Sequence, residues 1–232
     1  MAKRSRQLDL DLRETARWGG RRAGAGRKCG PSPRHARRPR APLASCNPCH
    51  VTLKVRRGLP SLRTMKLVRE WERSLAAACE RGRFRVTQYS IQNDHVHMIV
   101  EAASKKDLAS GMKSIGSRLA RAVNRIFRRR GAVLADRYHL HVLRTPREVR
   151  HALAYVLLNA RRHLAKLGRV LPRAPRIDPA SSGRFFSGWN RRFHPSSSSF
   201  PPPPVAPPRT WLLRVGWRRH GLIDPAEVPG PS

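Results

Sequence analysis

Two closely spaced pairs of histidines are the residues of this sequence whose types and spacing point most directly to chemistry. His95 and His97 lie within 95–101, where apolar residues alternate as in a strand. Side chains two residues apart on a strand point to the same side, so both imidazoles would share one face. Imidazole nitrogens are common ligands of divalent metals. His139 and His141 repeat the spacing on another predicted strand, and spacing alone does not choose between the two pairs.

Tyr155 is the residue that could act as a nucleophile beside such a metal. It belongs to a helix that the Thr145-Pro146 pair predicts, because proline is well tolerated at a helix start. Apolar residues form one stripe of that helix, and Tyr155 falls nearly opposite, one turn before Asn159. A phenol near a metal and arginines could attack a phosphodiester and hold a covalent phosphotyrosine. A surface tyrosine, or one docked on the C-terminal segment, fits the same pattern.

The charge of the chain points to a polyanionic partner. Lys and Arg number 49 and Asp and Glu 14 in 232 residues, a formal net charge of +35. Such a surface is untypical of an ordinary metabolic enzyme and favours nucleic acid as the partner. The N-terminus has no apolar run like that of a secretory signal, and no stretch reaches the ~20 apolar residues of a membrane span. We therefore expect a cytoplasmic, nucleoid-associated protein that does not bind membranes.

The cysteines carry a weaker signal. Cys46 and Cys49 precede His50 in the C-x-x-C-H pattern of c-type haem attachment. Haem attachment requires export, which nothing in the N-terminal sequence indicates, and a zinc site would need further ligands nearby. We expect a turn that leads into a strand.

The predicted elements give an α+β fold. Their order is strand, helix, strand, strand, helix, strand, helix, and the first six form the ferredoxin-like split β-α-β-β-α-β arrangement. That arrangement is an antiparallel sheet with helices on one face and the other face open for a site, here with an added C-terminal helix that carries Tyr155. The predicted strands are 50–55, 84–91, 95–101 and 138–144, and the predicted helices are 64–81, 107–130 and a last one from 145.

Composition divides the chain into four parts. Residues 1–48 are rich in Arg, Gly and Pro and are interpreted as a disordered basic arm. Residues 49–167 hold the folded domain. Residues 168–210 form a Pro/Ser/Arg-rich linker, and 211–232 form a C-terminal clasp and tail, in which the apolar run after Trp211 folds back onto the domain.

The far side of the second predicted helix, opposite its apolar stripe, is basic. Side chains there are placed to grip the phosphates of a nucleic acid, and one further arginine on the last helix is added to this set. The candidate DNA-binding residues are Lys113, Arg118, Arg121, Arg125, Arg128 and Arg162.

Three motifs together resemble a known family. They are Asn93–Glu101 with its His-Val-His core, the Asp-Arg-Tyr-His run 136–139, and the Tyr-x-x-x-Asn run 155–159. In this order they resemble the single-tyrosine HUH transposases, and more closely the REP-associated tyrosine transposases related to bacterial insertion sequences. The resemblance covers about 50–165.

The resemblance implies a mechanism and roles for residues. His95 and His97 would bind Mg²⁺ or Mn²⁺, with Asn159 completing the metal site. Tyr155 would cleave single-stranded or hairpin DNA and become linked to its 5′ phosphate, so the protein would act as a transposase, cutting and rejoining single strands. His139 matches a supporting strand position. Some members act as dimers and others as monomers, so the resemblance is compatible with either a homodimer or a monomer.

Two other functions are compatible with the same fold. An RNA-recognition sheet would carry stacking aromatics on its central strands, and the strand 95–101 has none. A catalytically inactive or domesticated DNA-binding descendant would keep all the candidate residues, so the sequence does not separate it from an active enzyme.

Overall fold

A computed structural model describes residues 41–78, 80–171, 176–190 and 202–230 of the chain. The first 40 residues of the predicted basic arm lie outside this range. The elements in chain order are β1 (Cys49–Lys54), α1 (Met65–Ala76), β2 (Glu80–Arg81), β3 (Phe84–Ile91), β4 (His95–Ala102), α2 (Lys105–Ile126), β5 (His139–Val142), α3 (Pro146–Leu157), α4 (Asn159–Lys166), η1 (Ser182–Phe185), α5 (Trp211–Arg214) and η2 (Gly216–His220).

The sheet is antiparallel and has the strand order β2-β3-β4-β1-β5. Without the two-residue edge strand β2, this is the order of the split β-α-β-β-α-β arrangement, so the predicted α+β fold is confirmed. The central strands β1 and β4 pair along their length, with Thr52 opposite His97 and Lys54 opposite His95. The histidine pair therefore lies in the middle of the sheet.

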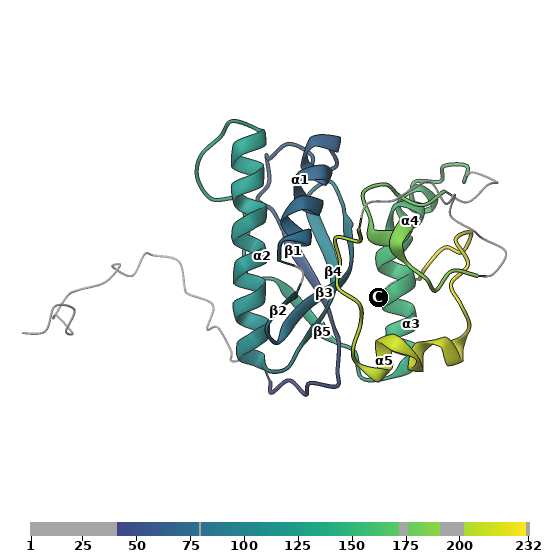
Figure 1. Ribbon diagram of the computed structural model, residues 1–232. Coiled ribbons are helices and arrows are strands. Elements are labelled where there is room, and N and C mark those ends of the chain that lie inside the picture. Colours follow the sequence, from purple (N-terminus) through teal and green to yellow (C-terminus); the bar gives the residue numbers. More distant parts are fainter. Residues whose placement is uncertain (1–40, 79, 172–175, 191–201, 231–232) are drawn as a thin grey trace, which may run out of the picture. The chain divides into compact units, whose positions relative to one another are not determined.

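Helices α1 and α2 cover one face of the sheet (Figure 1). Apolar side chains at helical spacing, such as Leu108, Met112 and Ile115, bury there against Val96 and Met98 of β4. Thr64 and Ser104 cap the two helices by accepting hydrogen bonds from backbone N–H groups of the first turn. The strand alternation thus sends the apolar residues of β4 into this core and the histidines to the opposite face.

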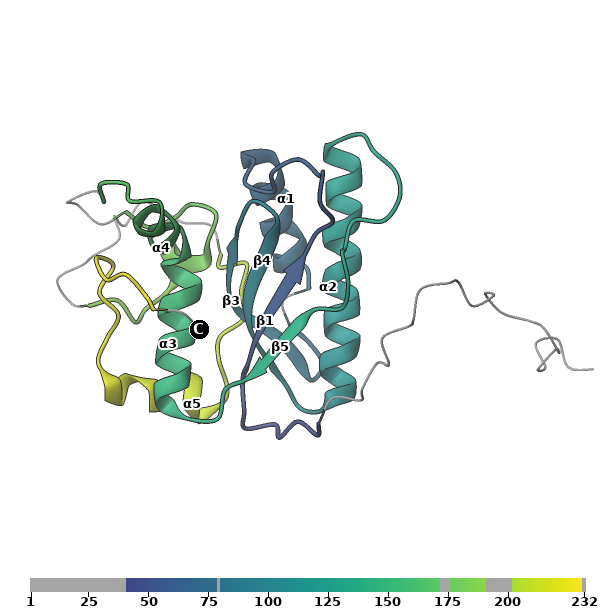
Figure 2. The same cartoon turned by 180° about the vertical axis from the view of Figure 1, so that it is seen from behind.

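The fold alone had suggested that the opposite face of the sheet is open, but helices cover it. Helix α3 lies across it, and the segment of α5 and η2 packs on α3 in turn (Figure 2). Leu153 of α3, with Leu213 and Trp217 of the C-terminal segment, is buried in this second core. Ala180 and Trp189 are also buried, so 176–190, which composition assigns to a linker, packs on the domain. Sparse apolar residues in a polar stretch gave no sign of this packing.

Several boundaries differ from the predictions, and helix α2 ends at Ile126 instead of residue 130. Helix α1 ends at Ala76, well before residue 81, because the chain turns into the β2–β3 hairpin, where Gly82 has a φ of +54° that glycine adopts without strain. Strand β5 is shorter than predicted. The last helix is interrupted at Leu158, whose φ and ψ of −107° and 17° end α3 before α4 begins. The turn predicted before β1 is confirmed at residues 45–46.

Across the described ranges, no helix has the length and apolar character that a membrane crossing needs.

Candidate active site

His95 and His97 face each other on β4. Their Nε2 atoms are 2.9 Å apart, and their rings lie edge to face with centroids 4.6 Å apart. Two ligand nitrogens at about 2.1 Å from one ion and at right angles are separated by about 3 Å, so this spacing suits two ligands of a single metal. The His97 ring is buried, whereas that of His95 is partly open. The pair can thus hold an ion that also meets a ligand from outside.

A carboxylate orients the first imidazole. Asp94 Oδ1 lies 2.7 Å from His95 Nδ1, and this hydrogen bond lowers the pKa of the Asp94 carboxyl. With Nδ1–H donating to Asp94, the lone pair of His95 Nε2 points toward His97. A carboxylate that holds a metal-ligating histidine in this way fixes its tautomer and raises its basicity. Asp94, just before the histidine strand, is therefore a residue that would hold a metal-binding side chain in place without contacting the metal itself.

Strand β1 supplies the partners of the second imidazole. His97 Nδ1 is 3.0 Å from Thr52 Oγ1 and 3.1 Å from His50 Nε2. Burial, with His50 and His95 close by, lowers the pKa of His97 to about 2. Burial, followed by the effect of His141 and His139, lowers the pKa of His50 to about 4. Both rings are neutral at physiological pH, which is the form that binds a metal.

The competing pair lies at the edge of the sheet. In the register of β1 and β5, His139 is opposite Thr52 and His141 is opposite His50. Both side chains are exposed. They lie on the same face of the sheet as the central pair, but on a short edge strand. Burial and mutual orientation therefore favour His95 and His97 over His139 and His141 as the metal-binding pair.

Tyr155 points to the histidines from α3. Its ring centroid is 5.1 Å from that of His97 and 5.6 Å from that of His50, both edge to face. The single apolar stripe had suggested that Tyr155 lies on a solvent-facing side of the helix. Its ring is instead half-buried. The reason is that α3 has two buried faces, one on the sheet and one under the C-terminal segment.

Asn159 is the one predicted site residue whose side chain is both completely buried and without a hydrogen-bond partner. Its relative exposure is 0 %, and within the described residues neither Oδ1 nor Nδ2 meets a partner. An unpaired buried amide is costly, and in a native structure it calls for an explanation such as an ion. An amide oxygen and two imidazole nitrogens are ligands that Mn²⁺ and Mg²⁺ accept. The residues present thus fit a divalent ion.

No carboxylate or thiolate joins this set. The described part of the chain holds no group of three or more His, Cys, Asp or Glu side chains arranged to bind a metal. The candidate ligands predicted from the sequence for a metal are therefore His95, His97 and the Asn159 amide.

The predicted DNA-binding residues fall on two sides of the sheet. Four of them are on α2, on the face away from the histidines, and Arg128 follows the end of this helix. Of these five residues, Arg118 is half-buried, the other four are exposed, and Arg125 forms an ion pair with Glu70. Arg162 is different: its guanidinium carbon lies 5.1 Å from the centroid of the Tyr155 ring. Arg162 is thus the predicted phosphate-binding residue that adjoins the site.

Sequence reasoning missed three residues of the site: His50, Thr52 and Asp94. His50 and Thr52 lie two apart on β1 and so share a face, a signal that the sequence does contain. What the sequence does not contain is the pairing of β1 with β4, which brings that face to His97. Asp94 lies in the motif 93–101, but it was assigned no role of its own.

Residues 50–156 match the family model described as "Transposase IS200 like". A comparison with curated proteins gave no match. Among solved structures, the chain is similar to one described as "Structure of the REP associates tyrosine transposase bound to a REP hairpin", with 19 % identity, coverage of 59 % of this chain and 76 % of that chain, and a TM-score of 0.45. The segment that matches the family model is a little under half of the chain, and it includes both central histidines and Tyr155.

Proposed function

We propose that the chain is a transposase that cuts and rejoins single-stranded DNA, with Tyr155 as the nucleophile. The observation that carries the proposal is the placement of the Tyr155 ring beside His97, whose Nε2 lies 2.9 Å from that of His95. A nucleophile next to a pair of metal-binding imidazoles is the minimum that phosphodiester cleavage through a covalent intermediate requires.

The chemistry is an exchange of one phosphate ester for another. The phenol oxygen of Tyr155 loses its proton and attacks the phosphorus, the bond from phosphorus to the 3′ oxygen of the preceding nucleotide breaks, and that oxygen takes up a proton. The product is a 5′-phosphotyrosine and a free 3′ hydroxyl. Attack by another 3′ hydroxyl reverses the exchange, which rejoins the strand and releases the tyrosine without an external energy source.

We further propose that His95, His97 and Asn159 hold a Mg²⁺ or Mn²⁺ ion. When bound, the ion would polarise a phosphoryl oxygen and stabilise the charge that develops on it. Asp94 and Thr52 act as positioning residues, because their contacts with the Nδ1 atoms of His95 and His97 turn the Nε2 atoms of both rings toward each other. The buried, unpartnered amide of Asn159 supports its inclusion.

Arg162 would hold the phosphate. Its guanidinium lies on the Tyr155 ring, which places a fixed positive charge beside the phenol. Arginine binds phosphates through paired N–H groups. The charge of +35 supports DNA as the partner, in single-stranded or hairpin form.

A covalent trapping experiment tests the proposal. The full chain is incubated with a labelled oligonucleotide that carries a hairpin and a single-stranded flank, with Mn²⁺ or with EDTA. We expect a protein–DNA adduct stable to denaturation with Mn²⁺ and none with EDTA. Strand binding without any adduct would contradict the proposed activity and favour an inactive DNA-binding descendant.

Tyrosine variants provide the matched control. Tyr155→Phe should bind the oligonucleotide but form no adduct. Tyr138→Phe should form it, because Tyr138 packs against the core on the other face of the sheet. An adduct in Tyr155→Phe would overturn the assignment of the nucleophile.

A further inference from the structure

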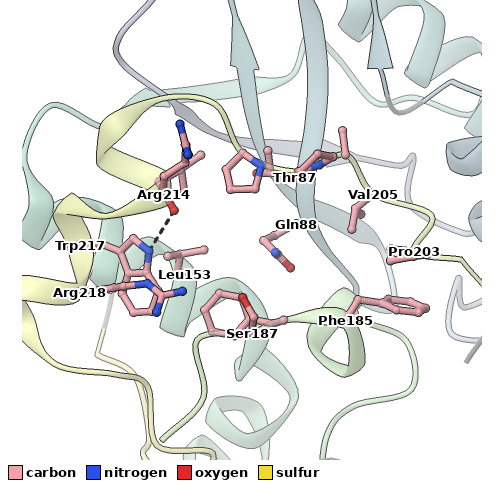
Figure 3. A pocket seen from close by; sticks show the side chains of 15 residues that line it. Thr87, Gln88, Leu153, Phe185, Ser187, Pro203, Val205, Arg214, Trp217 and Arg218 are labelled. Atoms are coloured by element: carbon pink, nitrogen blue, oxygen red, sulfur yellow. Dashed lines mark hydrogen bonds between the residues drawn. The ribbon is translucent and has the colours of Figure 1, made fainter. Parts of the chain in front are cut away.

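A cavity that no histidine lines lies on the α3 face of the sheet. It has a volume of about 270 Å³ and lies between β3, the loop after η1, the segment 203–208 and the C-terminal elements α5 and η2 (Figure 3). We propose that this cavity binds one unstacked base of the single-stranded DNA on which the chain acts. The inference rests on the proposed function and deepens it by naming where the strand beside the cleaved phosphate is held.

The walls offer aromatic rings to the flat faces of a base. Phe185 and Phe186, both partly exposed, line the cavity, and the Phe186 ring rests against the buried Trp217 ring, with centroids 5.6 Å apart at a tilt of 31°. Gly188 lets the loop approach this closely, because a Cβ there would be 2.5 Å from atoms of both rings. Aromatic side chains bind single strands through stacking, and every base offers a π face.

The rim carries positive charge. Arg214 and Arg218 line one end of the cavity, both exposed, and the guanidinium carbon of Arg218 lies 5.4 Å from the centroid of the Trp217 ring. No acidic residue is among the described residues that form the lining. An apolar slot with cations at its mouth fits a base attached to a phosphate backbone better than it fits a neutral apolar ligand.

Polar groups at the floor can meet the edge of a base. A bulge in β3 between Val86 and Gln88 places both Thr87 and Gln88 at the cavity. Figure 3 shows the Gln88 side chain directed into it, across from Ser187. Ser182 Oγ lies 2.6 Å from Gln88 Oε1, which fixes the amide and pre-orders it for a ligand.

The cavity is near enough to the site to receive a nucleotide from the same strand. Gln88 is opposite Ile99 in the sheet, and Ser90, two residues further along β3, is opposite His97. Two residues of strand span roughly 7 Å. Leu153 of α3 also lines the cavity, on the same helix as Tyr155 but on another side of it. A strand whose phosphate lies at Tyr155 would therefore carry its neighbouring bases toward this cavity.

The test combines base removal with three protein variants. Oligonucleotides with a single abasic site at each position of the flank are bound by the full chain at low salt, without metal so that no cleavage occurs. We expect one position at which base loss weakens binding about tenfold. Ser187→Trp, which fills the cavity from an exposed position, and Arg218→Ala should reduce that penalty to less than twofold.

Arg219→Ala is the matched control. Arg219 is exposed, on the same element, and stacks on Trp211 as Arg218 does on Trp217, but it does not line the cavity. It should keep the full tenfold penalty. A flank in which no abasic position weakens binding would overturn the proposal, and so would an equal abasic penalty in the Arg218→Ala and Arg219→Ala variants. Neither result would contradict adduct formation at Tyr155. Failure to bind any strand would overturn the proposed function as well.

Discussion

At the scale of single residues, the candidate site is built around two neutral imidazoles whose Nε2 atoms face each other. The choice between the two histidine pairs can be measured directly. His95→Ala removes one of two opposed Nε2 atoms and should abolish metal-dependent adduct formation. His141→Ala, on the exposed edge strand, should leave most of it. The reverse order of effects would show that the wrong pair was assigned to the metal.

Asn159 offers a second prediction, in which stability and activity move in opposite directions. Replacing a buried, unpaired amide by an apolar side chain of similar size removes a desolvation cost, so Asn159→Leu should raise the free energy of unfolding by about 1 kcal/mol in EDTA. The same variant should lose adduct formation in Mn²⁺. Urea denaturation followed by intrinsic fluorescence gives the first quantity. A variant destabilised by more than 1 kcal/mol would mean that the amide is satisfied in solution.

At the scale of elements, helix α2 carries most of the predicted DNA contacts, although it lies on the far face from Tyr155. If its side chains bind phosphates, the slope of log affinity against log salt should become shallower by about one for each contact removed. We expect a clear flattening when Arg118, Arg121 and Arg125 are all changed to Gln. An unchanged slope would indicate that α2 does not meet DNA and that Arg162 and its neighbours bind it instead.

The elements also show what the sequence could predict. The alternation in β4 and the apolar stripe of α2 were enough for the α+β arrangement, because each pattern has one solution that buries its apolar residues. The roles of His50 and Thr52 were not predictable, since they depend on which strand lies beside β4. The break at Leu158 was also missed, because the residues around it continue the helical pattern.

At the scale of the whole molecule, a buried carboxylate ties the C-terminal segment to the sheet. Glu101, at the end of β4, accepts hydrogen bonds from the backbone N–H groups of Arg209 and Thr210 at 2.7–3.1 Å, just before α5. Glu101→Gln should weaken this attachment by roughly 1–3 kcal/mol, because charged hydrogen bonds are exchanged for neutral ones.

Limited proteolysis detects the effect. Cleavage within 202–223 should be faster in Glu101→Gln than in the native chain, whereas Asp224→Asn, whose carboxylate only accepts from the nearby Ala226 N–H, should behave as the native chain does. Equal cleavage rates would show that the packing of Leu213 and Trp217, rather than the carboxylate, holds the segment.

The central claim is that one phenol oxygen of the chain becomes bonded to DNA, and the most direct measurement is to find that bond. The adduct formed with Mn²⁺ is digested with nuclease and protease, and the peptide that retains a nucleotide is sequenced by mass spectrometry. The account predicts a nucleotide on Tyr155, joined through its 5′ phosphate. A nucleotide on Tyr89, Tyr138 or any other residue, or one joined through its 3′ phosphate, would contradict it.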